Sequence, residues 1–326
     1  MTETLSSSKA VHHLLVEAGS LQKGEKVLIV VDEQTESIGV DFFKQALAQG
    51  SFPTLMMIPL SNNHGEEPPP ETASLMSEVH LIVNLTSFSK AHTHARIRAA
   101  EKGARFLSLP EYSKDVLLNP AVMVDYKAQE KYVRLFSEAF SKGSSVHVTT
   151  AKGTNLLLDI RGRTGNYCPG FVTMEHRLGS PPDIEANVSP VETASTGEIV
   201  VDGSIACPQI GLLRTPMILE IAQGRIQSFQ SEDKKLVSTI QNIFEKVNSS
   251  KAYILAECGV GLNPLATLTG SMLTDEGALG CVHFGFGSNA TVGGINDVPF
   301  HLDFVVREAS LAIDGKAYLE QGQIVL

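Results

Sequence analysis

This sequence of 326 residues has few charged residues, and acidic ones predominate among them. Charged residues make up 19% of the chain, with 36 acidic against 26 basic, which gives a formal net charge of −10 at pH 7. Nucleic acids and anionic membranes attract basic surfaces, so an acidic chain binds them poorly. We therefore expect neither nucleic acid nor a membrane as partner.

Long apolar runs and cysteine pairs are missing as well. No segment approaches the ~18 apolar residues that span a bilayer, and the N-terminal MTETLSSSKAVHHLLVEAG lacks the basic start and apolar run of a signal peptide. Scattered cysteines without a CxxC pair are typical of a reducing compartment; here they are Cys168, Cys207, Cys258 and Cys281. These features predict a cytoplasmic enzyme.

The first 143 residues alternate strand and helix patterns. Apolar runs such as GEKVLIVVD (24–32) and HLIVNLT (80–86) are separated by amphipathic segments such as TESIGVDFFKQALAQG. This alternation predicts an α/β domain with a parallel sheet and helices on both of its faces. The first strand runs into DEQTES, so the glycine-rich phosphate loop of nucleotide-binding folds is missing at that place.

From residue 144 the pattern becomes rich in strands, including NLLLDI, GEIVVDG and MILEIAQG. A single long helix is predicted over 231–247, opening with an acidic Ser-Glu-Asp cap. We therefore predict two domains, an α/β domain over 1–143 and a strand-rich α+β domain over 144–326. The second domain is the one that contains the candidate metal ligands.

The segment 280–306, GCVHFGFGSNATVGGINDVPFHLDFVV, carries the strongest functional signal. His301 and Asp303 stand two apart in an apolar strand pattern, so their side chains leave the same face. A carboxylate in such surroundings is unfavourable unless it is paired or binds a metal. The same pattern also fits a His–Asp hydrogen bond that only orders the core.

Further candidate ligands lie at positions upstream of this pair. Glu257 is predicted at the end of an apolar strand, in YILAECGVGLNP, and Glu192 lies between a proline and a strand. Carboxylates with a minority of imidazoles suit Zn, Mn, Co or Fe(II), and five ligands suffice for two adjacent ions. The candidate set is Glu192, Glu257, His283, His301 and Asp303.

The motifs AECGVGLNP, DEGALGCVHFGFG, NDVPFHLDFVV and LAIDGK resemble the metal-site motifs of the aminopeptidase T / aminopeptidase S metallopeptidase family. The resemblance implies that the five candidates bind two metal ions, with Glu257 or Asp303 as the bridge, and that the protein is a homodimer acting on peptides. The chain departs from the family after His283, where HFGFGSNATVGG contains no tyrosine.

The N-terminal half resembles another branch of the same superfamily. The segment TSFSKAHTHARIRAAEKGARFLSLPE is similar to the corresponding region of 2,5-dihydroxypyridine 5,6-dioxygenases, which are mononuclear Fe(II) enzymes. This resemblance implies that His92 acts as a base. In that branch a His-His-Asp set holds the iron, whereas here the first position is Glu257. The alternative for His92 and His94 is that they only cap or solvate a helix.

Three functions are therefore expected, in this order. The first is a metal-dependent hydrolase, an aminopeptidase with two Zn, Co or Mn ions, in which Glu257 is catalytic. The second is an Fe(II) ring-cleaving dioxygenase for a dihydroxypyridine-like aromatic, with iron on Glu257, His301 and Asp303 and with His92 as base. The third is a metal-stabilised binding protein without catalytic activity.

Overall fold

A computed structural model describes residues 5–325, and its contacts divide the chain into two compact units. Unit 1 comprises Met1–Ala128 and Pro169–Pro182, and unit 2 comprises Gln129–Cys168 and Asp183–Leu326. The sequence places a boundary between residues 143 and 144, whereas the division falls near the start of a helix, α6 (Tyr126–Lys142). The sequence does not predict that residues 169–182 belong to unit 1, because the strand in this segment is too short to show a pattern.

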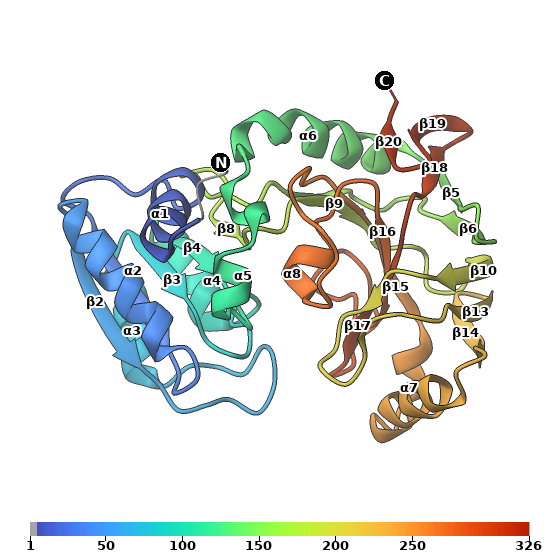
Figure 1. The fold of residues 1–326 in the computed structure, drawn as a ribbon, viewed down its shortest axis with the longest axis horizontal. Coiled ribbons are helices and arrows are strands. Elements are labelled where there is room, and N and C mark those ends of the chain that lie inside the picture. The colour runs from blue at the N-terminus through green and yellow to red at the C-terminus, as the bar shows by residue number, and fades with distance from the viewer. Residues whose placement is uncertain (1–4, 326) are drawn as a thin grey trace. The chain divides into compact units, whose positions relative to one another are not determined.

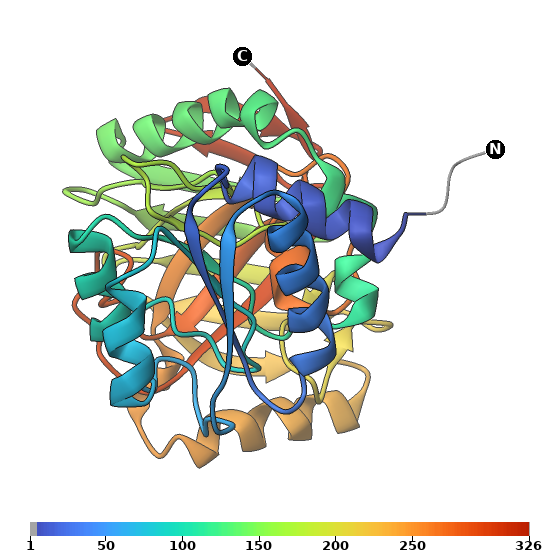
Figure 2. The ribbon, with the colours of Figure 1, turned by 90° about the vertical axis from the view of Figure 1, so that its left-hand side faces the viewer.

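Unit 1 contains a five-stranded sheet in the order β2-β1-β3-β4-β8, and every neighbouring pair is parallel. This confirms the predicted α/β architecture (Figures 1 and 2). The strands are β1 (Lys26–Val31), β2 (Phe52–Met57), β3 (Leu81–Asn84), β4 (Arg105–Ser108) and β8 (Leu178–Gly179). The helices are α1 (Ser7–His13), α2 (Glu36–Ala48), α3 (Pro70–Met76), α4 (His94–Glu101) and α5 (Lys114–Leu117), with a π-helical turn over Leu14–Ala18 and a 3₁₀ turn over Pro120–Met123.

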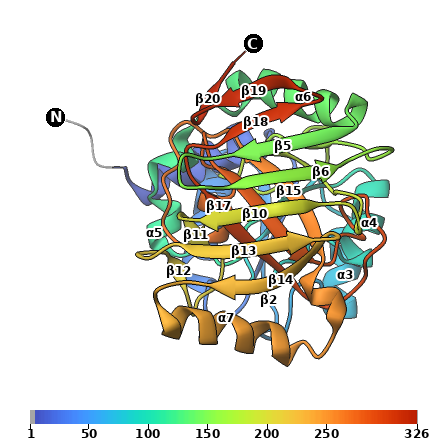
Figure 3. The same cartoon turned by 90° about the vertical axis from the view of Figure 1, so that its right-hand side faces the viewer.

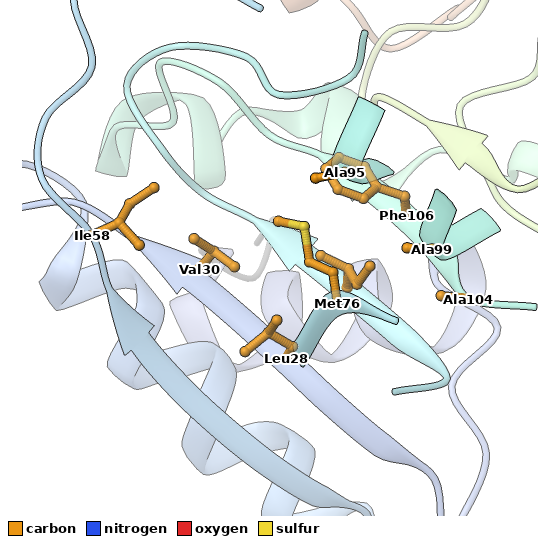
Figure 4. Packing of buried hydrophobic residues seen from close by; sticks show 9 residues of the cluster. Leu28, Val30, Ile58, Met76, Ala95, Ala99, Ala104 and Phe106 are labelled. Atoms are coloured by element: carbon orange, nitrogen blue, oxygen red, sulfur yellow. The ribbon is translucent and has the colours of Figure 1, made fainter. Parts of the chain in front are cut away.

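Helices cover both faces of this sheet. Alternate residues of β1 point to opposite faces, and those on each face are buried against helices. Leu28 and Val30 belong to a buried cluster with residues of α3, α4 and β4 (Figure 4). On the other face, Val31 packs so closely against α2 that a Cβ added at Gly39 would lie 2.3 Å from its Cγ1. The cluster in Figure 4 contains Leu28, Val30, Ile58, Met76, Ile82, Ala95, Ala99, Ala104 and Phe106.

Unit 2 contains two antiparallel sheets, as Figure 3 shows with the larger one facing the viewer. The eight-stranded sheet has the order β14-β13-β10-β6-β5-β18-β19-β20. Its strands are β5 (Ser145–Thr149), β6 (Asn155–Asp159), β10 (Thr196–Val201), β13 (Met217–Ala222), β14 (Arg225–Gln230), β18 (Ser310–Ile313), β19 (Lys316–Glu320) and β20 (Gln323–Ile324). Unit 2 is therefore the predicted strand-rich part of the fold.

The seven-stranded sheet has the order β12-β11-β17-β16-β15-β9-β7 and carries the candidate site. Its strands are β7 (Asn166–Cys168), β9 (Glu185–Val188), β11 (Ser204–Ile205), β12 (Gly211–Leu212), β15 (Leu255–Gly261), β16 (Val282–Gly287) and β17 (His301–Val306). Every residue of β9, β15 and β16 is buried. Polar side chains on these strands therefore lie inside the protein.

The remaining helices of unit 2 are α7 (Lys234–Lys246), α8 (Met272–Asp275) and a 3₁₀ turn over Ser250–Tyr253. The predicted acidic cap of α7 is confirmed, because the Asp233 carboxylate accepts hydrogen bonds from two backbone N–H groups of the first turn. Within residues 5–325, the helices are all too short or too polar to cross a membrane.

The buried cluster of unit 1 leads to a stability prediction. Replacing Phe106, which is 1% exposed, with alanine should lower the free energy of unfolding by about 3–5 kcal/mol, because the removed ring leaves a cavity. The matched control is Phe52→Ala on the edge strand β2, where the ring is 67% exposed and a change within about 0.5 kcal/mol is expected. Urea unfolding followed by circular dichroism measures both, and equal losses would contradict the packing.

Candidate metal centre

Four adjacent strands bring acids and imidazoles to one face of the seven-stranded sheet. Glu257 of β15 lies opposite Gly285 of β16, which lies opposite Asp303 of β17. His283 of β16 lies opposite Gly259 of β15 in the same way. Residues that are opposite one another across antiparallel strands share a face. The full set on this face is Glu185, Glu257, His283, His301 and Asp303.

Glycines between these residues leave the room that the site needs. A Cβ added at Gly259 would lie 2.1 Å from His283 Nε2, and one added at Gly285 would lie 2.6 Å from His301 Nε2. Both glycines of AECGVG belong to strand β15, and Glu257 lies inside that strand. The prediction that Glu257 ends a strand before a glycine-rich turn is wrong, because the glycines serve close side-chain approach.

The two histidines lie on either side of Glu257. His283 Nε2 is 3.0 Å from Glu185 Oε2 and 3.7 Å from Glu257 Oε1. His301 Nε2 is 3.5 Å from Glu257 Oε2 and 3.3 Å from Asp303 Oδ1. Each oxygen of the Glu257 carboxylate thus faces a different imidazole, so this one side chain connects the two halves of the cluster.

The donor set fits a metal cation. Ligand atoms of Glu185, Glu257 and His283, all buried, lie within 4.8 Å of one another. Buried Glu185 Oε2 and Asp303 Oδ1 are paired only with the imidazoles of the cluster in the contacts given above, and buried Asp183 Oδ1 has no hydrogen-bond partner among the described residues. A buried polar atom without a partner costs about 1–3 kcal/mol, more when charged, and a bound cation removes this cost. These residues can therefore hold a metal ion.

Charges within the cluster shift the pKa values of its members in opposite directions. Burial acts to raise the pKa of Asp303, but the adjacent His301 outweighs it and lowers this pKa to about 2. Burial acts to lower the pKa of His301, but Asp303 and Glu257 raise it to about 10. For His283, Glu185 has the same effect and raises the pKa well above its usual value. Without a metal, the imidazoles thus hold protons that metal binding must displace.

A second layer of hydrogen bonds orients the ligands. His301 Nδ1 lies 2.8 Å from the backbone carbonyl of Ser288, which leaves Nε2 facing the cluster. Asn187 Nδ2 donates to Glu185 Oε1 at 2.7 Å. Partners of this kind fix ring orientation and carboxylate geometry in metal sites.

Four of the five predicted ligands meet at this site, namely Glu257, His283, His301 and Asp303. The structure does not bring Glu192 to them. Its carboxylate forms an ion pair with Arg163 and accepts hydrogen bonds from Asn289 and Ile295. Sequence reasoning missed Glu185, although Glu185 and Asn187 alternate in β9 as Glu257 and Gly259 do in β15.

Two further acidic residues lie close to the cluster. Burial raises the pKa of both Asp183 and Glu276 well above the usual range, and neighbouring carboxylates add to the shift. Glu276 follows the last residue of α8, and its Oε1 is buried. Glu276 also helps to lower the pKa of Asp303 by a hydrogen bond.

His92 belongs to unit 1 and is exposed in the turn before α4. The cap of this helix is Thr93, whose hydroxyl oxygen accepts from the Arg96 N–H at 3.2 Å. The helix cap is thus provided by the threonine. A role of His92 as a base stays a prediction.

Comparisons with known proteins extend over the whole chain. Residues 9–326 match the family model described as NicX, 2,5-dihydroxypyridine 5,6-dioxygenase. A curated protein of that name from Pseudomonas putida strain KT2440 is 28% identical over 219 residues, which cover 63% of this chain and 61% of the relative. The match therefore spans about three fifths of the length of that relative.

Two solved structures share the fold. The 2,5-dihydroxypyridine dioxygenase of Pseudomonas putida KT2440 gives a TM-score of 0.83 at 18% identity, covering 100% of this chain and 98% of the other. Wild-type AmpT from Thermus thermophilus gives a TM-score of 0.70 at 14% identity, covering 98% and 99%. These likenesses show that the chain has the same fold as the dioxygenase and as AmpT.

The glycines of the centre lead to a test of its geometry. Gly259→Ala should greatly weaken metal binding, because the new methyl group would occupy the place of His283 Nε2. Cys258→Ala is the matched control, since its buried side chain points to the opposite face of the same strand. Metal content after dialysis, measured by elemental analysis, should fall in the first variant and stay at the wild-type level in the second. Unchanged metal content in Gly259→Ala would show that metal binding does not depend on the position of His283.

Proposed function

The chain belongs to the family of 2,5-dihydroxypyridine 5,6-dioxygenases, and from this premise we propose that it is a metal-dependent ring-cleaving dioxygenase. Its proposed substrate is a dihydroxylated pyridine or a closely related aromatic ring. The match of the family model to residues 9–326 is the observation that carries the proposal. This function was the second expectation. The first, an aminopeptidase, is supported by the fold that the chain shares with AmpT.

The proposed cofactor is a ferrous ion held by Glu257, His301 and Asp303, as the resemblance implies. Mixed carboxylate and imidazole ligands suit Fe(II). When bound, the ion supplies the one-electron chemistry by which dioxygen reacts with a closed-shell ring. Glu185 and His283 border the same carboxylate, Glu257, and they keep the neighbouring part of the cluster polar and charged.

The residues of the chain supply positioning and proton transfer. The Ser288 carbonyl lies against His301 Nδ1, which leaves Nε2 to bind the ion beside Asp303 Oδ1. A dihydroxylated ring must lose a hydroxyl proton to become electron-rich, and we propose that His92 accepts this proton. Histidine suits this role because its ordinary pKa lies near neutrality.

A direct assay tests the proposed reaction. The protein is purified without oxygen, its metal content is measured, and Fe(II) is added before 2,5-dihydroxypyridine and ¹⁸O₂. We expect oxygen uptake that depends on iron and on the pyridine, with both labelled atoms in the ring-opened product. Oxygen uptake at the rate of the iron-only blank would overturn the proposal.

The arrangement around Glu257 favours an aminopeptidase as the second candidate. Its two oxygens face different histidines, as expected for a carboxylate shared between two ions. The same protein loaded with Zn, Co or Mn is therefore assayed with aminoacyl-p-nitroanilides. About two ions per chain together with nitroaniline release would favour this candidate over the dioxygenase.

The ligand assignment predicts the effect of changes in β17. Asp303→Asn should reduce ring cleavage to the background rate and lower the iron content, because an amide is a poor ligand that also fails to balance His301. Glu308→Gln, an exposed change shortly after the same strand, should leave both at the wild-type level. Iron content and oxygen uptake measure the two effects. Full iron content in Asp303→Asn would contradict its assignment as a ligand.

The proposed base leads to a separate prediction. His92→Ala should lower the rate of ring cleavage by ~10²–10⁴, which is the usual contribution of a positioned base. Because His94 is also exposed at the start of α4, His94→Ala is the matched control and should remain close to wild type. Steady-state rates across pH 5–9 measure both variants. If both histidine variants kept wild-type rates, His92 would not be the base.

A further inference from the structure

Glu192 holds the loop between β16 and β17, residues 288–300, by hydrogen bonds. Glu192 Oε1 accepts hydrogen bonds from the Ile295 backbone N–H and from Asn289 Nδ2, both at 2.9 Å. The Ile295 side chain itself is 83% exposed, so apolar packing does not hold this part of the loop. A buried carboxylate holds it instead.

Arg163 completes this anchor from a different segment. Its guanidinium forms an ion pair with Glu192 Oε2, and its Nη1 donates to the Gly293 carbonyl at 2.8 Å. The two side chains are only 12% and 11% exposed. A buried ion pair is favourable only when its remaining donors and acceptors are satisfied, and here the loop supplies partners to both side chains through two backbone groups and the Asn289 amide.

The same loop contacts the metal centre directly at His301 and is linked to Glu185 through two asparagines. The Ser288 carbonyl lies 2.8 Å from His301 Nδ1. Asn166 Nδ2 donates both to the Val292 carbonyl at 3.0 Å and to Asn187 Oδ1 at 2.6 Å. Asn187 Nδ2 in turn donates to Glu185 Oε1 at 2.7 Å. The loop thus connects the Glu192–Arg163 pair to one side chain on each side of Glu257.

We propose that Glu192 and Arg163 are positioning residues that orient His301 and Glu185 through this loop, and that Glu192 is not a metal ligand. Both oxygens of Glu192 are engaged by the loop and by Arg163. Its ligand atoms are also outside the converging group of the described residues, which consists of Glu185, Glu257 and His283. The inference deepens the proposed function and rests on it for the presence of a metal.

Cobalt binding tests this inference without any turnover. The variants Glu192→Gln and Arg163→Gln, and the double variant, are titrated with Co(II) against a chromophoric chelator, and metal per chain is measured at saturation. We expect the wild-type number of ions and an unchanged ligand-field spectrum in each variant. The dissociation constant should rise about 10–100-fold, as it does when the partners of metal ligands are lost. The double variant should bind cobalt about as tightly as the single variant with the lower cobalt affinity, because both side chains act through one loop.

The matched control is Glu25→Gln, which breaks another buried ion pair, with Arg105, in unit 1. It should keep the wild-type cobalt affinity. A missing ion or an altered spectrum in Glu192→Gln alone would make Glu192 a ligand and overturn the proposal. Unchanged affinity, or a wild-type protein that binds no cobalt, would overturn it as well. Cobalt affinity is read independently of oxygen uptake, so failure of the dioxygenase proposal is seen separately.

Discussion

The burial of several carboxylates on one face of a sheet is the constraint on which unit 2 depends. Asp183, Glu185, Glu257 and Asp303 are each less than 10% exposed, and their charges repel one another. Such a group is stable only when protons, imidazolium groups or metal ions balance it. The surrounding structure meets this requirement with two histidines whose pKa values are raised and with hydrogen bonds to neighbouring amides.

The same strands form both the metal centre and the apolar core, because side chains alternate between faces. In β16, His283 points to the centre while Phe284 and Phe286 point away from it, and Phe286 meets Phe304 of β17 edge to face at 5.4 Å. The aromatic face anchors the strands, so the ligands are carried by rigid elements. Glycines on the polar face give the ligands space, which explains why this part of the sequence is rich in glycine without being a loop.

Local patterns predicted most of the fold. The apolar run 24–32 and the amphipathic segment after it became β1 and α2, and the pair His301 and Asp303 shares a face as its spacing requires. Short or ambiguous patterns did not predict the remaining features. Strand β8 has two residues, the extent of β15 was hidden by glycines, and Glu185 and Glu192 look alike in sequence. Only the strand register shows which of these two carboxylates faces the cluster.

Charge balance relates the two proposed functions to one centre. If Glu185, Glu257 and Asp303 are ionised and both histidines are neutral, the cluster carries three negative charges. One divalent ion then leaves a net charge of −1, which a protonated His283 beside Glu185 would cancel at their separation of 3.0 Å. Two divalent ions would give +1, and both imidazoles would have to be neutral to bind them. By this count the protonation state of His283 would distinguish the proposed one-metal oxygenase from the alternative two-metal hydrolase on the same set of side chains.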